Sequence, residues 1–495
     1  MLQLIEAIRS GNIADFKGEG LKVYPASLTT AGGTTIAIVR TTEGKKLIAV
    51  GEGELFDQLQ GEEAAAGAKV APLSHANRLT LNRFLPYTAP QAFGTKVATM
   101  GLGDRLGIAS PGHIQTLRGK DIRPVLAQQS IRELALTGRT YEDVLDAAAY
   151  AVLQEGYKDG YGADGDHLKK EADIEYALRL GFTMLTLDCS EYIDNTIDPL
   201  SEAEVDAKYA ALPAELRSHY ETRYLASAPN VPGASLNYTA LALKKDVLIY
   251  DAAINFMEAI YRRYIESLDR EVDFEISIDE TATPTSPEAH YLVANELQAR
   301  GVRIFSMAPR FCGEFQKGID YIGDIAQFER ELASHAAIAV HFGYKLSIHS
   351  GSDKFSVFPL IGQYTNGLFH IKTAGTNWLE AVRVVTKVNP DLYRRMHQYA
   401  LDHFEEATAY YHVTTDLSVI APLGEVSDAQ LPEYMNENNA RQLLHITYGL
   451  LLQAKNADGS LTFADEFFQT LAEQEDVFAA GLRSHIGRHL ELLGK

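Results

Sequence analysis

Short apolar runs that end in polar loops recur along this chain, and stretches with helical periodicity separate them. The clearest run, residues 345–349, ends at His349 and leads into a loop with Ser350, Asp353 and Lys354. Seven further runs share the pattern: the one that starts at residue 96, and then 122–127, 161–164, 182–187, 272–278, 303–308 and 368–372. Strands that alternate with helices are typical of parallel βαβ units. Eight of them favour a closed (β/α)8 TIM-type barrel of the α/β class over an open doubly wound sheet.

The chain is too long for one minimal core, so further structural units are expected around the barrel. Residues 1–92 predict a small α+β unit, because strand-like runs and turn residues follow one another there. The barrel is expected over residues 93–380, with a helical insertion at 190–271 after the fourth strand. Residues 381–495 show helical periodicity, which predicts a helical C-terminal region.

Charge and targeting signals narrow the function classes. The formal net charge is -21, with 45 basic against 66 acidic residues. Such a surface opposes nucleic acids and anionic membranes, and neither is expected as a partner. A small anionic substrate stays compatible, because screening over about 8–10 Å leaves local cations in control of a pocket. No secretory signal and no long apolar run is found, so we expect a cytoplasmic protein.

Two further classes are disfavoured by missing motifs. Only Cys189 and Cys312 are present, which argues against a disulfide scaffold or a zinc ribbon, and both are expected to be buried. Gly101-Leu-Gly103 is not a dinucleotide fingerprint, and no phosphate-binding Gly-x4-Gly-Lys-Ser/Thr motif occurs. The sequence therefore favours neither a nicotinamide nor an ATP enzyme.

Carboxylates and imidazoles follow several of the predicted strands. Glu275 and Asp279 share one strand face, which would point them into the barrel. A charge there is costly unless it is paired or metal-bound, so Glu275 is either a functional group or one half of a structural ion pair. His349 stands at a strand end, and His167 follows Asp166 in a polar loop, where Asp166 could equally cap a helix.

Together, two or three His, Glu or Gln groups from different strand ends could hold a divalent cation such as Zn²⁺, Mn²⁺ or Ni²⁺. No compact ligand motif supports this, so the metal prediction rests on position alone. Six other histidines lie in helical patterns without acidic partners nearby in the sequence, and are expected to be surface or packing residues: His335, His341, His397, His403, His485 and His489.

The last predicted strand leads into a candidate anion site. The loop Gly375–Asn377 opens a helix next to Lys372, and backbone N–H groups at a helix start can bind an oxyanion. Lys354 would add charge, although simple helix capping explains the loop equally well. The sixth strand is followed by Arg310, Glu314 and Gln316 at close spacing.

At these residues the chain resembles the tagaturonate/fructuronate epimerases, a family whose members are also studied as tagatose or fructose 4-epimerases. The likeness spans nearly the whole chain and rests on five motifs: Gly-Leu-Gly-Asp104-Arg105-Leu-Gly with Ser-Pro-Gly-His113; Asp166-His167-Leu-Lys169; Phe-Glu275-Ile-Ser-Ile-Asp-Glu; Pro-Arg310-Phe-Cys-Gly-Glu-Phe-Gln316-Lys317-Gly-Ile-Asp320-Tyr; and Ser-Ile-His349-Ser-Gly-Ser-Asp353-Lys354. The resemblance implies a divalent-metal isomerase that interconverts D-tagaturonate and D-fructuronate in hexuronate breakdown.

The resemblance also implies roles for individual residues. Asp166 and Glu275 match the acid/base pair, and His167 and His349 match metal ligands, with Gln316 or Glu314 as the third. The remaining candidates are expected to contact the substrate, a keto-hexuronate or a ketohexose: Asp104, Arg105, Gln129, Asp188, Arg310, Lys354, Lys372 and Thr376.

The chemistry of the two sugars favours one route. They differ at a carbon β to the ketone, so enolisation cannot invert that centre, whereas retro-aldol cleavage and re-addition can. Transient oxidation at this carbon is the alternative route. Other functions left open are a class II aldolase, a metal-dependent ketose isomerase and a carbohydrate-binding protein. The native metal, the uronate or ketose preference and the oligomeric state, including a homo-oligomer, are not decided by the sequence.

Overall fold

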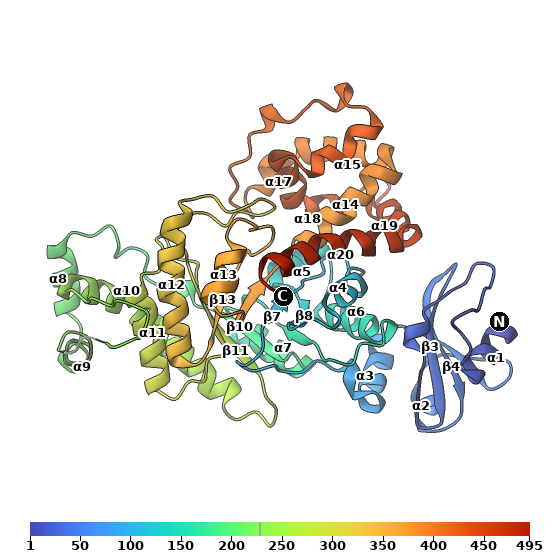
Figure 1. Cartoon of the computed structure of the whole chain (residues 1–495), viewed down its shortest axis with the longest axis horizontal. Coiled ribbons are helices and arrows are strands. Elements are labelled where there is room, and N and C mark those ends of the chain that lie inside the picture. The colour runs from blue at the N-terminus through green and yellow to red at the C-terminus, as the bar shows by residue number, and fades with distance from the viewer. Residues whose placement is uncertain (227–228) are drawn as a thin grey trace.

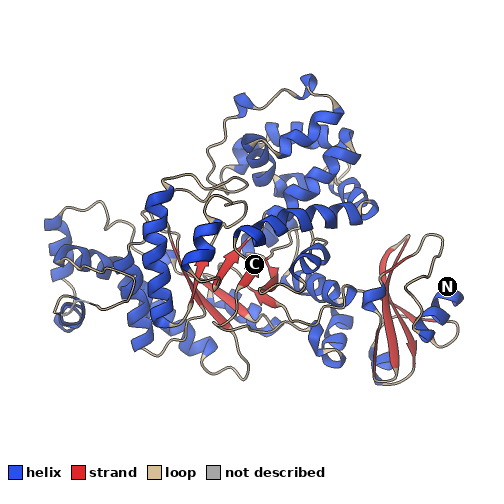
Figure 2. Cartoon of the chain, in the orientation of Figure 1, coloured by secondary structure: helices blue, strands red, loops and turns tan. Residues whose placement is uncertain are grey.

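The computed structural model describes residues 1–226 and 229–495, except for the side chain of Thr376. Its centre is a closed barrel in which all eight neighbouring strand pairs are parallel and follow chain order (Figures 1 and 2). The strands are β7 (Thr99–Gly101), β8 (Arg123–Gln128), β9 (Gly162–Asp164), β10 (Met184–Asp188), β11 (Asp273–Ile278), β12 (Ser306–Pro309), β13 (Lys345–Ile348) and β14 (Phe369–Lys372). This confirms the predicted (β/α)8 barrel, including its weakest strand at residues 162–164.

Helices follow the barrel strands and cover the outside of the barrel. They are α4 (Ser110–Leu117), α5 (Ile131–Thr137), α6 (Tyr141–Gln154), α7 (Glu171–Leu180), α11 (Pro287–Ala299), α12 (Ile325–Phe342), α13 (Phe358–Tyr364) and α14 (Thr376–Val388). Local residues set their ends: Thr140 and Asp143 form a capping box at the start of α6, and α12 begins after Asp324 and ends at Gly343, whose φ is 76°.

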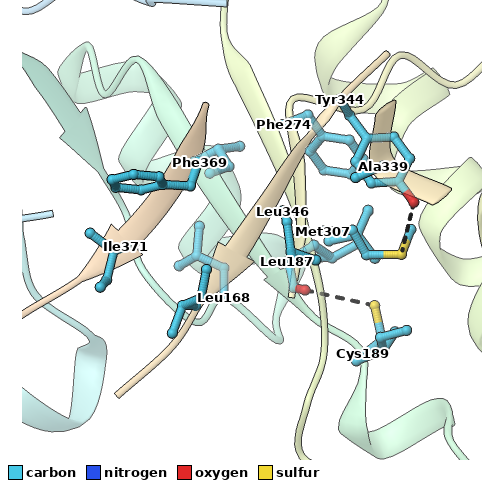
Figure 3. Packing of buried hydrophobic residues seen from close by; sticks show 14 of the residues in the cluster. Leu168, Leu187, Cys189, Phe274, Met307, Ala339, Tyr344, Leu346, Phe369 and Ile371 are labelled. Atoms are coloured by element: carbon cyan, nitrogen blue, oxygen red, sulfur yellow. Dashed lines mark hydrogen bonds between the residues drawn. The ribbon is translucent and has the colours of Figure 1, made fainter. Parts of the chain in front are cut away.

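Strand residues alternate between an apolar outer face and a polar inner face. Outward residues of five consecutive strands pack together beneath the helices, among them Leu187, Phe274, Met307, Leu346 and Phe369 (Figure 3). Their neighbours in sequence carry carboxylates, hydroxyls, lysines and imidazoles, and hydrogen bonds join these across the barrel interior. A barrel interior this polar must be neutralised within itself, which concentrates charge chemistry at the barrel axis.

The N-terminal unit lies beside the barrel and is coloured blue in Figure 1. It contains a six-stranded antiparallel sheet with the order β1-β3-β4-β6-β5, and β2 pairs with β3. Its elements are α1 (Leu2–Ser10), β1 (Lys22–Val23), β2 (Thr29–Ala31), β3 (Thr34–Thr41), β4 (Gly44–Gly51), α2 (Glu54–Gln58), β5 (Glu62–Ala64), β6 (Ala68–Pro72) and α3 (His75–Phe84). Lys22 and Lys45 of this sheet form ion pairs with Glu475, which joins the unit to the C-terminal helices.

The insertion after β10 is helical and lies at the end of the molecule opposite the N-terminal unit (Figure 1). It contains α8 (Glu202–Ala210), α9 (Ala214–Tyr224) and α10 (Ala240–Ile260), which continues into a π-helical turn, Tyr261–Ile265. No helix in the described part of the chain is both long enough and apolar enough to span a membrane. Cys189 and Cys312 are free and buried, as expected.

The C-terminal helices form a second apolar core on the barrel, around the fully buried Trp378. They are α15 (Pro390–Asp402), α16 (Phe404–Ala407), α17 (Asn438–Ile446), α18 (Tyr448–Gln453), α19 (Ala464–Glu473) and α20 (Glu475–Leu492). In Figure 1 this layer, coloured orange to red, lies along one side of the barrel. Arg441 of α17 pairs with Asp353 in the loop after β13, so the layer reaches the rim loops.

Candidate active site

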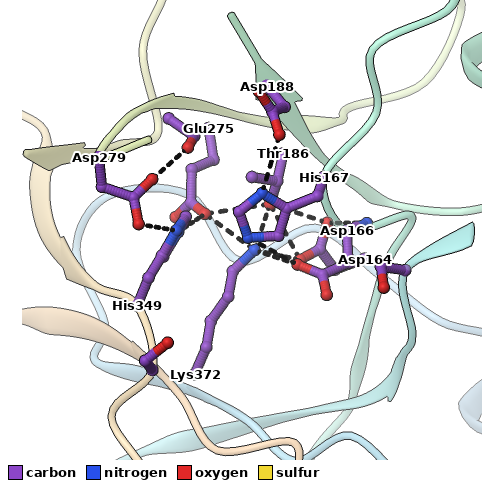
Figure 4. Close-up of polar contacts among 12 residues, drawn as sticks. Asp164, Asp166, His167, Thr186, Asp188, Glu275, Asp279, His349 and Lys372 are labelled. Carbon is purple, nitrogen blue, oxygen red and sulfur yellow. Dashed lines mark hydrogen bonds and ion pairs between the residues drawn. The ribbon is translucent and has the colours of Figure 1, made fainter. Parts of the chain in front are cut away.

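Polar side chains from five strands meet at the carboxyl-end rim of the barrel (Figure 4). We call this set the rim cluster, defined as Asp164, Asp166, His167, Thr186, Asp188, Glu275, Asp279, His349 and Lys372. They lie in or directly after β9, β10, β11, β13 and β14, and most stand at the carboxyl ends of these strands, which open on one rim. The cluster contains both residues predicted as acid/base groups and two of the predicted metal ligands.

Lys372 holds three carboxylates together at the centre of the cluster. Its Nζ lies 2.9 Å from Asp164, 2.7 Å from Asp166 and 3.0 Å from Glu275. Burial alone would lower the pKa of Lys372, but these carboxylates raise it well above its ordinary value. Lys372 is therefore charged at neutral pH and is committed to the protein's own carboxylates.

The three carboxylates differ in how readily they take a proton. Burial opposes ionisation of each, but Lys372 and the nearby imidazoles lower the pKa of Asp166 and of Glu275. Asp164 has its pKa raised, first by burial and then by the charges of Asp166 and Glu275. Thr186 lies between them, with Oγ1 3.0 Å from an oxygen of Asp164 and of Glu275. Asp166 is thus an ionised acceptor, as a general base must be.

Two imidazoles lie side by side above this centre, with 4.9 Å between ring centroids. His349 Nε2 is 2.8 Å from Glu275 Oε1, and its Nδ1 is 3.2 Å from Asp279 Oδ2. His167 Nδ1 is 3.4 Å from Asp188 Oδ2. Burial lowers the pKa of His349, but Asp279 and Glu275 outweigh it and raise that pKa to about 10.

The rim cluster has the donor set that a divalent cation requires. Five carboxylates face one lysine and two imidazoles, and Lys169 reaches Asp188 only from the exposed edge, at 3.5 Å. His167 Nδ1 and His349 Nδ1 each face a carboxylate oxygen, of Asp188 and of Asp279, at ion-pair distance but without hydrogen-bond geometry. Ligand atoms of His167, Asp188 and Glu280 also lie within 4.8 Å of one another. Imidazole nitrogens and carboxylate oxygens within this distance suit Zn²⁺, Mn²⁺ or Ni²⁺.

Backbone strain is concentrated in the loops of this rim. Asp166, His167 and Ser350 have φ values of 46°, 47° and 49°, in the left-handed region that non-glycine residues rarely adopt. Such strain costs about 1–3 kcal/mol per residue and is held by the surrounding contacts. It fixes the direction of Asp166 and of the two imidazoles.

Two cavities meet at His349, and Asp279 and Ser350 also line both. The larger has a volume of about 280 Å³ and is lined by Arg310, Glu314, Gln316 and His412. The smaller, of about 160 Å³, is lined by Asp166, His167, Lys317 and Lys372. Glu275 is fully buried and lines neither of these two cavities, so it lies one layer below Asp166.

The structure gives several predicted substrate contacts a structural role instead. Lys354 is fully buried and donates to the carbonyls of Gln316, Ile319 and Ser352 at 2.7–2.8 Å. Arg105 donates twice to Glu133, and Asp104 accepts four backbone N–H groups of the following turn. These charged side chains therefore bind other groups of the protein and stabilise the loops of the rim.

The other predicted residues lie at different depths. Gln129 is buried and accepts from Arg139, whereas Arg310 lines the larger cavity. Gln316 Oε1 accepts from Thr414 and from Gln442, so this oxygen is already occupied by protein donors, and Glu314 lines the larger cavity beside it. Thr376 begins α14, and its side chain lies outside the described part of the structure.

Sequence reasoning missed parts of this arrangement. Asp164 ends β9 and stands two residues before Asp166, in the polar run that the sequence shows there, so a signal was available. Thr186 had no such signal. His485 and His489 were expected to be surface or packing residues, which is wrong for His485: its Nε2 pairs with Asp353 Oδ1, and His489 accepts the Asp353 N–H at 3.1 Å. These partners come from loops more than a hundred residues away in the sequence.

Comparisons with known proteins show which proteins this chain resembles. A sequence model described as tagaturonate epimerase matches residues 24–493. A tagaturonate/fructuronate epimerase from Thermotoga maritima is 42% identical over 485 residues, which is 97% of this chain and 98% of that protein. Crystal structures of a fructuronate-tagaturonate epimerase from Cohnella laeviribosi, native and complexed with glycerol, superpose with a TM-score of 0.95 at 65% identity, covering 100% of this chain and 99% of theirs.

Proposed function

The chain belongs to the tagaturonate epimerase family and is an epimerase, and from this premise we propose that it interconverts D-tagaturonate and D-fructuronate by retro-aldol cleavage and re-addition, with a divalent cation held beside His167 and His349. One observation carries the proposal. An ionised carboxylate, Asp166, lines a small cavity together with both imidazoles, over a buried lysine-carboxylate centre. Cytoplasmic location and a homo-oligomeric state stay predictions.

The reaction must invert a carbon that the ketone does not acidify. In our proposal Asp166 removes the proton from the hydroxyl on that carbon, and the bond toward the ketone side breaks to give an aldehyde and an enediolate. The aldehyde turns, the enediolate adds to its other face, and Asp166 returns the proton to the new hydroxyl. When bound, the cation would supply Lewis-acid polarisation of the ketone oxygen.

The other groups of the cluster have supporting roles in this scheme. Lys372 keeps Asp166 ionised, and its fixed position 2.7 Å away directs the carboxylate. Glu275 was predicted as the second acid/base group. Because it lies below the cavity and contacts His349, we assign it to positioning that ring. Asp279 lines both cavities and can exchange a proton on the opposite side of the substrate.

Chelation and repletion test the proposal. The protein is treated with a chelator, repleted separately with Mn²⁺, Ni²⁺ or Zn²⁺, and incubated with D-tagaturonate, and NMR follows D-fructuronate. We expect product only after repletion. No product with any of the metals would contradict the proposed function, and accumulation of aldehyde fragments without the epimer would favour an aldolase.

Isotopic labelling tests the route. Deuterium on the inverting carbon is retained in a retro-aldol reaction, because that C–H bond never breaks. We therefore expect no primary kinetic isotope effect and full retention of the label. A primary effect would instead indicate transient oxidation at that carbon.

A further inference from the structure

We propose that Lys317 binds the carboxylate group of the uronate substrate and makes the site prefer uronates over neutral ketoses. The inference rests on the proposed function, since it assigns a binding partner to the carboxylate group, which uronates have and neutral ketoses lack. It starts from the cations around the smaller cavity, which is lined by Asp166, His167, Lys317 and Lys372.

Most cations near this cavity already have anionic partners. Lys372 contacts three carboxylates, and Arg105 is paired with Glu133 through Nε and Nη2. Lys169 lies 3.5 Å from Asp188 and 3.8 Å from Glu280. The charges of these three cations are already matched by carboxylates of the protein, so a substrate carboxylate would gain less from them.

Lys317 is different: its Nζ donates to Ser350 Oγ at 3.0 Å, and the described residues offer this ammonium group no other hydrogen bond. No carboxylate of the described residues lies within ion-pair distance, 4.0 Å, of this ammonium group. An anion bound in the cavity would gain a charge-assisted contact with this ammonium group.

Neighbouring groups allow an anion to approach this side. Glu133 also lines the cavity, but the guanidinium of Arg105 neutralises it. Gly375, the residue before α14, lines the same cavity, so the positive end of this thirteen-residue helix faces it as well. Both features favour a carboxylate beside Lys317 over a neutral hydroxymethyl group.

The position of Lys317 also fits the reaction. Its ammonium group is held by Ser350, the residue after His349, and Asp166 and His349 line the same cavity. A uronate carboxylate at Lys317 would lay the carbon chain past His349 toward Asp166. Two further cations fit less well: Arg132 lines the same cavity but is exposed and donates to the carbonyl of Tyr410, and Arg310 lines the other cavity.

The test compares Lys317→Met, Lys317→Arg and a control, Lys387→Met, at an exposed lysine of α14. For the metal-loaded enzymes we measure kcat and KM for D-tagaturonate, and inhibition of that turnover by D-tagatose. Losing one contact between charged groups should raise KM for D-tagaturonate about 10- to 100-fold in Lys317→Met. We expect kcat to change much less, inhibition by D-tagatose to be unchanged, Lys317→Arg to recover part of the loss, and the control to match wild type.

The outcomes separate this inference from the proposed function. Unchanged KM in Lys317→Met, or equal weakening of D-tagaturonate and D-tagatose, would overturn the role of Lys317. If D-tagatose inhibits neither wild type nor Lys317→Met measurably, the comparison of Lys317→Arg with Lys317→Met decides. In that case, a KM for D-tagaturonate that is as high in Lys317→Arg as in Lys317→Met would overturn the role. If the wild-type enzyme does not epimerise D-tagaturonate, the proposed function itself fails, whatever the variants do.

Discussion

Two histidine-carboxylate clusters in this molecule use similar residues for different purposes. The rim cluster lies at the mouth of the barrel, and a second group, which we call the Asp353 cluster, joins Asp353 to Arg441 of α17 and to His485 and His489 of α20. Both place imidazole nitrogens and carboxylate oxygens within 4.8 Å of one another. By residue type alone, either could hold a metal ion.

The two clusters differ in their balance of partners. In the Asp353 cluster, one carboxylate oxygen is 2.7 Å from Arg441 and the other is 2.5 Å from His485, while the Asp353 N–H donates to His489. In the rim cluster carboxylates outnumber cations, and the contacts of His167 Nδ1 with Asp188 and of His349 Nδ1 with Asp279 are ion pairs without hydrogen-bond geometry. We infer that a cluster with excess negative charge beside a cavity is the reactive site. A cluster whose charged groups are all paired instead connects elements of the fold.

The largest expected effect is a loss of kcat when the proposed base of the rim cluster is replaced. Asp166→Asn removes the base but leaves Lys372 with Asp164 and Glu275, so the fold should persist. We expect kcat to fall about 10²- to 10⁴-fold, the usual contribution of a general base. Epimer formation by NMR and the melting temperature are the measurements. A variant that lost stability but kept its turnover would give Asp166 the role we assign to Asp353.

The Asp353 cluster should show the opposite pattern. Asp353→Asn leaves Arg441 buried without its partner, which costs about 3–5 kcal/mol of unfolding free energy. Turnover per folded molecule should fall far less than in Asp166→Asn. Denaturant unfolding measures the loss, and Arg441→Met in the same chain is the control. The double variant should be less destabilised than the sum of the single variants, and simple additivity would argue against coupling.

A smaller effect is expected from the hydroxyl at the centre of the rim cluster. Thr186→Val removes hydrogen bonds to Asp164 and Glu275 while keeping the shape of the side chain. Hydrogen bonds to charged groups contribute about 1.5–3 kcal/mol, so stability should fall by up to that amount. Because Thr186 does not line either rim cavity, KM should be little affected. A large rise in KM would place Thr186 in contact with the substrate.

The last effect concerns the pH dependence of stability. Burial opposes ionisation of Asp353, but His485 and Arg441 hold its pKa well below the ordinary value near 3.8. A lowered carboxyl pKa stabilises the fold above the unfolded-state pKa, and this contribution is lost as pH falls toward the folded-state pKa. The melting temperatures of wild type and Asp353→Asn should therefore differ fully at neutral pH and converge below about pH 4. A constant gap would mean that Asp353 is not ionised in the fold.

Much of the fold could be predicted from the sequence, because a parallel barrel strand is a local signal. Each run combines an apolar outer face with polar residues at its carboxyl end, as 272–278 and 345–349 illustrate, and alternation with helices then fixes the direction of the strands. The same logic brought Asp166, Glu275 and His349 to one rim. Depth was not predictable, because strand alternation places Glu275 inward without showing that it lies below the cavity.

The roles of the cations could not be predicted, because they depend on partners distant in the sequence. Lys354 was predicted to contact the substrate, but its ammonium group donates hydrogen bonds to three backbone carbonyls. Lys317 looked ordinary and is the lysine left without a carboxylate partner beside the rim cavity, among the residues described. Likewise, the partners of His485 became apparent only when α20 was placed against the loop after β13.

Cation binding to the two clusters tests the central claim most directly. The chelated protein would be titrated with Mn²⁺, and bound metal measured in wild type, in a His167→Ala/His349→Ala double variant and in His485→Ala, with circular dichroism confirming the fold of each. We predict that wild type and His485→Ala bind the cation equally and that the double variant loses it. Retention of the cation by the folded double variant, with loss in folded His485→Ala, would contradict the assignment of the rim cluster as the reactive site.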